Sequence, residues 1–127
     1  MPYVSNNYAS NTNAPIDANT WVGEAPYYGQ CVSYVKFVTP ELPQTPIWRK
    51  GSQVKGNFKI LRGTVIATFD ANNHYSGHAA IYEGQNAAGI NVVDQWITPP
   101  AQPIHRRMLR FGAHGNSNNG DNFFVVE

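Results

Sequence analysis

The sequence has little cysteine, little charge and no long apolar run. Cys31 is the only cysteine among 127 residues. An internal disulfide is therefore excluded, as is any metal site built from several thiolates. Nine basic and eight acidic residues leave a net charge of +1, which gives no reason to expect nucleic acid or membrane insertion. No segment approaches the roughly 20 apolar residues that span a bilayer.

The N-terminal segment lacks the features of a secretory leader. Residues 1–7 contain neither a basic stretch nor an apolar one, so a Sec signal is not indicated. We expect synthesis in the cytoplasm and, if the protein is exported, a route that reads no N-terminal signal. Residues 1–20 are rich in Asn, Ser, Thr and Ala and are predicted to form a flexible arm. The remainder, residues 21–127, has the length of one domain.

A helix is predicted over residues 29–38. Within this range, Val32 and Val35 are three residues apart and Tyr34 and Val38 are four apart, as on one face of a helix. The helix begins near Gly29 and ends before Pro40, because a residue that precedes proline disfavours the helical conformation.

Five short β-like runs follow a proline-rich and then basic connector, residues 39–63, which is predicted to be a solvated loop. The runs are rich in β-branched and aromatic residues and are separated by turn signals. They cover residues 64–69, 78–83, 90–96, 107–111 and 123–126. No helix lies between them, so successive strands should pair antiparallel. The predicted class is α+β, with one helix packed on a roughly five-stranded sheet.

Cys31 lies at the predicted start of the helix. A helix N-terminus carries partial positive charge and free N–H groups. Both favour the thiolate, which is the reactive form of cysteine, and the N–H groups can bind an oxyanion. The alternative is that Cys31 is a small buried apolar residue, which is how free cysteines are most often used.

His78 opens the second predicted strand, and Asp94 lies near the end of the third. If these strands form a hairpin around residues 85–89, Asp94 is opposite His78 or one diagonal step away. Such neighbours have β-carbons about 5 Å or about 7–8 Å apart, so a carboxylate can orient the imidazole. A register slip of one residue would bring Gln95 there instead. Ala80 shares the predicted face of His78, and a helix packed there would bring Cys31 to His78.

Three segments together resemble the motifs of CHAP domains and of the related NlpC/P60 domains. They are Gly29–Val35 around the cysteine, Gly77–Tyr82 around the histidine and Val92–Trp96 around the acid. These families are papain-like cysteine amidases and peptidases that cut bacterial peptidoglycan. The resemblance covers residues 25–126, although CHAP domains commonly use Glu where this chain has Asp94.

The resemblance implies a site and a substrate. Cys31 would be the nucleophile, His78 the general base and acid, and Asp94 the residue that orients His78. The substrate would be an amide bond of a peptidoglycan stem peptide or cross-bridge. Further orienting or substrate-contacting candidates close to these positions are Gln95, Gln30, Tyr28 and Trp96.

The resemblance also implies a setting. A small cysteine amidase of this kind is similar to the antibacterial effectors that a type VI secretion system delivers into a rival's periplasm. Such toxins usually have an immunity protein as partner. The protein would then be made in a bacterial cytoplasm, leave by a non-Sec route and act in the periplasm or cell wall, as a monomer.

No cofactor and no metal are expected. His74 and His78 are four residues apart, which in extended chain is about 13 Å and too far to share one ion. His105 and His114 fall in predicted loops.

Two other functions remain open: a deamidase or acyltransferase acting on proteins, and a binding module on the same scaffold without catalysis. Arg106, Arg107 and Arg110 are candidates to bind a substrate carboxylate, although the ends of a surface strand explain them better.

Overall fold

One α-helix and six strands make up the secondary structure, which the computed structural model describes over residues 1–127. The helix is α1 (Cys31–Val38), and two short 3₁₀ turns are η1 (Thr45–Ile47) and η2 (Gly120–Asn122). The strands are β1 (Lys50–Gln53), β2 (Val65–Phe69), β3 (Tyr75–Gln85), β4 (Gly89–Trp96), β5 (Gln102–Arg110) and β6 (Phe124–Val126). This confirms the predicted α+β class.

The helix α1 begins at Cys31, two residues later than Gly29. Gln30 is the N-cap residue with extended backbone, and Gly29 has a positive φ of 81°, which turns the chain into the helix. The helix ends at Val38, before Pro40 as predicted. Its buried face is formed by Tyr34, Val35 and Val38. The chain contains no helix with the length and apolarity to cross a bilayer.

The strands form a single antiparallel sheet in the order β1-β6-β2-β3-β4-β5. All five predicted strands are present, but the sheet has one more. β1 lies in the segment predicted to be a solvated loop, and its sequence, Lys-Gly-Ser-Gln, has no apolar alternation because it is a mostly exposed edge strand. β5 begins at Gln102 and includes Pro103, which an edge strand tolerates.

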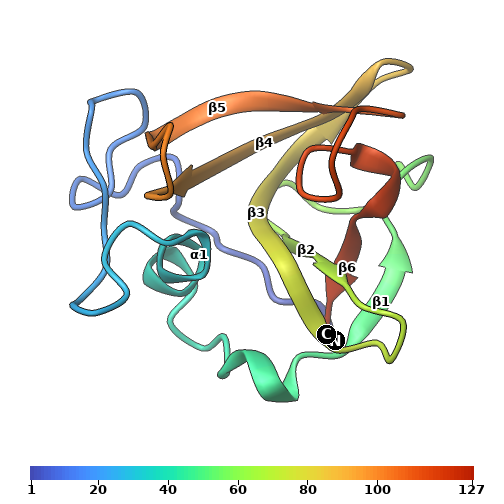
Figure 1. Cartoon of the computed structure of the whole chain (residues 1–127), viewed down its shortest axis with the longest axis horizontal. Helices are drawn as coiled ribbons and strands as arrows, with labels where there is room; N and C mark the ends of the chain where they lie inside the picture. The colour runs from blue at the N-terminus through green and yellow to red at the C-terminus, as the bar shows by residue number, and fades with distance from the viewer.

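The hairpin of β3 and β4 has one of the two predicted registers. Ile81 is opposite Val93, and Tyr82 is opposite Val92. Extended along the strands, this pairing places His78 and Asp94 one diagonal step apart. The paired residues end at Ile81 and Val93, and beyond them β3 bends away from β4 (Figure 1). His78 and Asp94 therefore lie where the two strands separate.

The two faces of the sheet bury separate apolar clusters. One cluster joins the buried face of α1 to Ala79, Ile81 and Val93. The other contains Ala80 and residues from β2, β4, β5 and β6, around which the sheet curls. The helix therefore packs on the face of Ala79, and the expectation that it packs on the face of Ala80 is wrong. Alanine occurs at both positions, so side-chain size gives no means of choosing between the faces.

The first 20 residues, predicted to be a flexible arm, pack against the domain. Val4 forms an isolated bridge with Thr64, and Ser5 donates to the carbonyl of Val38 at 2.6 Å. Tyr8 and Ala14 are buried in the same cluster as α1. Although few residues of this segment are apolar, those few contribute to the core.

Candidate active site

The start of α1 presents Cys31 to the sheet. Cys31 is the first helical residue and is half-buried. Its backbone N–H donates to no backbone carbonyl, as expected for the first turn of a helix. The thiol and a free N–H therefore occupy the same end of the helix, where the partial charge is positive.

The position of His78 depends on the residues immediately before it. Gly77 has a positive φ of 111°, and a Cβ at this position would collide with Oγ1 of Thr68. This close approach lets Thr68 accept a hydrogen bond from the backbone N–H of His78 at 2.9 Å. His78 is 6% exposed, so its ring is held in one place and only a small part of it meets solvent.

The imidazole of His78 contacts the carboxylate of Asp94 directly. Nε2 of His78 lies 2.6 Å from Oδ2 of Asp94, which is completely buried. Asp94 accepts, so Nε2 carries the proton in this bond, and Nδ1 is left to face Cys31. Of the two side chains considered from the sequence, Asp94 contacts His78 and Gln95 does not.

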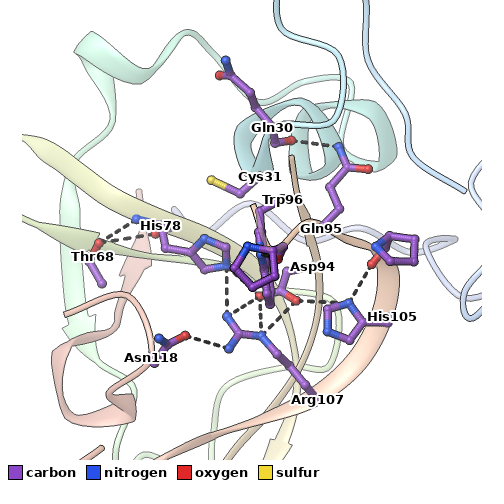
Figure 2. A network of polar contacts seen from close by, with 12 residues as sticks. Gln30, Cys31, Thr68, His78, Asp94, Gln95, Trp96, His105, Arg107 and Asn118 are labelled. Atoms are coloured by element: carbon purple, nitrogen blue, oxygen red, sulfur yellow. Dashed lines mark hydrogen bonds and ion pairs between the residues drawn. The ribbon is translucent and has the colours of Figure 1, made fainter. Parts of the chain in front are cut away.

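Arg107 on β5 contacts the same carboxylate and lies below the pair in Figure 2, on the side away from Cys31. Its Nε is 3.1 Å from Oδ1 and 2.9 Å from Oδ2 of Asp94, and its Nη2 is 2.8 Å from Oδ2. Nη2 also lies 3.3 Å from Nε2 of His78, because both nitrogens point at one oxygen. Asn118 accepts from Nη1 at 2.9 Å, and His105 Nδ1 is farther from the carboxylate, at 3.9 Å.

The charges of these groups shift one another's pKa values. Burial would raise the pKa of Asp94, but His78 and Arg107 outweigh burial and hold it below its usual range. Burial would lower the pKa of His78, but Asp94 and Cys31 raise it to about 9. Burial would raise the pKa of the Cys31 thiol, but the His78 imidazole, and to a lesser degree Tyr75, lower it. Both shifts favour a thiolate beside an imidazolium over the neutral thiol and imidazole.

Gln95 holds the segment that leads into the helix. Its side-chain NH₂ donates to the carbonyls of Val22 and Gln30, at 2.9 and 2.8 Å, and its Oε1 accepts from the N–H of Val22 at 2.9 Å. Gln95 is completely buried. It therefore fixes the residue just before Cys31 relative to β4, whereas Asp94 fixes His78.

The other candidates differ in their distance from the site. The side chain of Gln30 lines the groove described below but points away from His78 (Figure 2). The ring of Trp96 lies edge-on to His78 at 6.1 Å and under the guanidinium of Arg107 at 4.6 Å. Tyr28 is 48% exposed and does not line the groove, whereas its neighbour Tyr27 does.

The site opens into a groove of about 1130 Å³. Cys31, His78 and Arg107 all line it, and Trp96 and Pro100 form part of its wall. A space of this size has room for a peptide segment rather than a single small ion. The chain has no group of three or more His, Cys, Asp or Glu side chains placed to hold a metal ion.

Two residues of the site were not identified from the sequence. Tyr75 places its hydroxyl 3.5 Å from Sγ of Cys31; it belongs to β3, which begins three residues earlier than predicted. The sequence predicts Arg107 to be a surface residue or a ligand of a substrate carboxylate. In the structure the Arg107 side chain is 18% exposed and bound to Asp94. Arg107 is paired with Val92, so Asp94 is its diagonal neighbour on β4. Knowledge of this pairing would have identified Arg107 as a partner of Asp94.

The fold and the site together define the class. A thiol at a helix start, an imidazole on an adjoining antiparallel sheet and a buried carboxylate behind it are the arrangement of papain-like cysteine hydrolases. Over residues 1–126 the chain matches the model of the family described as domesticated amidase effector 2. It belongs to this family and is an amidase.

Individual relatives agree with this assignment. The domesticated amidase effector 2 of Ixodes scapularis is 44% identical over 103 residues, which cover 77% of this chain and 70% of that protein. A type VI secretion amidase effector 2 protein of Salmonella typhi is 38% identical over an alignment of 142 positions that covers both proteins completely. The solved structure of a type 6 secretion amidase effector 2 superposes with a TM-score of 0.79 at 33% identity, covering 98% of this chain and 94% of that one.

Proposed function

We propose that this amidase hydrolyses amide bonds of bacterial peptidoglycan, in the stem peptide or its cross-bridge. Cys31 is the nucleophile, His78 the general acid and base, and Asp94 the residue that orients His78. The observation that carries the proposal is the 2.6 Å contact of His78 with buried Asp94, beside a thiol whose pKa is lowered, in a groove with room for a peptide.

In the first half of the reaction, the Cys31 thiolate attacks the amide carbonyl carbon. The carbonyl oxygen becomes an oxyanion, and the free N–H of Cys31 at the helix start is suited to donate to it. Nδ1 of His78 gives its proton to the leaving nitrogen, the C–N bond breaks and an amine departs. A thioester on Cys31 and a neutral His78 remain.

In the second half, water is the nucleophile. Nδ1 of His78 takes a proton from the water as the oxygen attacks the thioester carbon. The C–S bond then breaks, the carboxylic acid product leaves and the thiolate and imidazolium are restored. Asp94 accepts from Nε2 throughout, so it keeps the ring in one orientation while Nδ1 gains and loses its proton.

We propose that the protein acts as an antibacterial effector. Relatives that match the chain well are named as type VI secretion amidase effectors, which supports delivery by such a system into the periplasm of a rival cell. A dedicated immunity protein would then protect the producing cell. The 1130 Å³ groove around Cys31 is the surface that such an inhibitor has to close.

Isolated sacculi test the proposal directly. Wild-type protein should release peptide fragments that liquid chromatography and mass spectrometry detect, and Cys31→Ala and His78→Ala should release none. His114→Ala, at an exposed loop residue, is the matched control for the histidine change and should remain active. Circular dichroism would verify that each variant is folded.

The products also separate the alternative functions. Fragment masses that differ by one hydrolysed amide identify the bond that is cut. Release of ammonia with an intact backbone would indicate a deamidase instead. Binding of muropeptides without any release, and equal in wild type and Cys31→Ala, would indicate a binding module and contradict the proposed hydrolysis.

A further inference from the structure

The hydroxyl of Tyr75 is the side-chain oxygen that reaches Cys31. Tyr75 is the first residue of β3, and its Oη lies 3.5 Å from Sγ. Both side chains line the same groove. The hydroxyl forms no other hydrogen bond within the chain, so its polar end has Sγ as its partner.

The ring of Tyr75 is held independently of this contact. It packs edge-to-face on Trp48, with ring centroids 5.0 Å apart and an interplanar angle of 66°. Trp48 is itself buried, and its Nε1 donates to the carbonyl of Pro43 at 2.8 Å. The hydroxyl therefore points at Sγ because of packing on the opposite side of the ring, and removing the oxygen leaves that packing in place.

The hydroxyl is a donor rather than a second base. Burial raises the pKa of Tyr75, and the adjacent charge of Cys31 raises it further, to well above the ordinary value for tyrosine. The O–H therefore keeps its proton across the pH range in which the enzyme can act. A protonated hydroxyl beside a sulfur that becomes a thiolate donates its hydrogen to that sulfur.

We propose that Tyr75 is a further catalytic residue, whose hydroxyl donates a hydrogen bond to Sγ of the Cys31 thiolate. This bond stabilises the thiolate in addition to the charge of His78. The inference rests on the proposed role of Cys31 as nucleophile but not on the identity of the substrate. Other charged side chains that line the groove with Cys31 are Arg107, Glu24 and Lys36. Asp94 does not line the groove and acts through His78.

Alkylation tests the hydrogen bond without any substrate. The rate at which iodoacetamide labels Cys31 follows the thiolate fraction, and Cys31 is the only cysteine to label. Tyr75→Phe removes the oxygen and keeps the ring on Trp48. We expect the pH midpoint of labelling to rise by about one unit, the effect of losing one hydrogen bond to an ion.

Tyr82→Phe is the matched control, because Tyr82 lies on the same strand and its hydroxyl bonds Gln85 instead. Its labelling midpoint should coincide with that of wild type. Thermal melting would verify that Tyr75→Phe keeps its fold. If the folded variant labels with the midpoint of wild type, the inference is overturned.

The two proposals can fail separately. Suppose that wild type does not hydrolyse sacculi but the labelling midpoint still shifts in Tyr75→Phe. That result would contradict the proposed substrate and leave the role of Tyr75 intact. In the reverse case, hydrolysis by wild type with unchanged labelling in Tyr75→Phe contradicts the role of Tyr75 alone.

Discussion

Asp94 and Gln95 are neighbours on β4, and their side chains hold the two halves of the site. Asp94 binds His78 at 2.6 Å, and Gln95 binds the carbonyl of Gln30, the residue before Cys31, at 2.8 Å. Side chains alternate across a strand, so one dipeptide contacts both His78 and the segment that leads into Cys31. The separation of His78 from the helix start is therefore set by the backbone of β4, which is paired on both sides.

Gln95→Glu should weaken both stability and activity. A carboxylate at this position still accepts from the N–H of Val22 but no longer donates to the carbonyls of Val22 and Gln30. Loss of these donors in a buried place should lower the free energy of unfolding by ~2 kcal/mol or more, as measured in urea. Gln102→Glu, at an exposed position on β5, should change it little; equal midpoints for both variants would contradict the role of Gln95.

Asp94→Asn should remove most of the activity while conserving volume. Without the carboxylate, Nε2 of His78 loses its charged partner, and we expect kcat to fall by about 100-fold or more. The change also leaves Arg107 without its counter-ion, so the melting temperature should fall. Peptide-release kinetics and a melting curve check both effects. Activity within a few-fold of wild type would exclude Asp94 as the orienting residue.

Arg107→Lys should lower kcat with little change in KM. Lysine keeps the positive charge but cannot place two N–H groups on one carboxylate, as Nε and Nη2 of Arg107 do. Asp94 would then be free to rotate away from His78. Arg110→Lys, at the exposed end of β5, is the control and should retain activity. A rise in KM at constant kcat would indicate instead that Arg107 binds substrate.

The pH dependence should follow His78. Its pKa is raised from 6.5 to about 9, so its charged contacts contribute fully to stability below pH 6.5 and are lost as the pH rises through about 9. The value of kcat/KM should also fall as the pH rises through about 9, because His78 then loses the proton that it would give to the leaving amine. Urea unfolding and kcat/KM from pH 6 to 10 measure both effects. In His78→Ala the stability change over this range should be smaller.

The pairing of His78 with Asp94 was predictable because two strands and one short turn determine it. Alternating side chains and a turn at residues 85–89 leave few registers, and one of these is observed at Ile81 and Val93. Sequence could not choose between Asp94 and Gln95, since the choice depends on a single-residue shift. In the structure Asp94 contacts His78, whereas Gln95 contacts Val22 and Gln30.

Contacts between distant parts of the chain were not predictable in the same way. The helix packs on the face of Ala79 and not on that of Ala80, and two adjacent alanines give no pattern to distinguish them. The pairing of β3 with β4 ends at Ile81 and Val93, and Gly77 marks the place of His78 only once its close approach to Thr68 is known. In the sequence alone, Arg107 has the features of a surface residue. Its contact with Asp94 follows only from the pairing of β5 with β4.

The residues of this site come from widely separated parts of the chain. Cys31 belongs to the one helix, whereas His78, Asp94 and Arg107 come from three successive strands that end at an edge of the sheet. No contiguous fragment shorter than the span from Cys31 to Arg107 contains them all. Catalytic activity should therefore emerge last during refolding, after helix and sheet have docked. A partly synthesised chain that does not yet include β5 should therefore have no amidase activity.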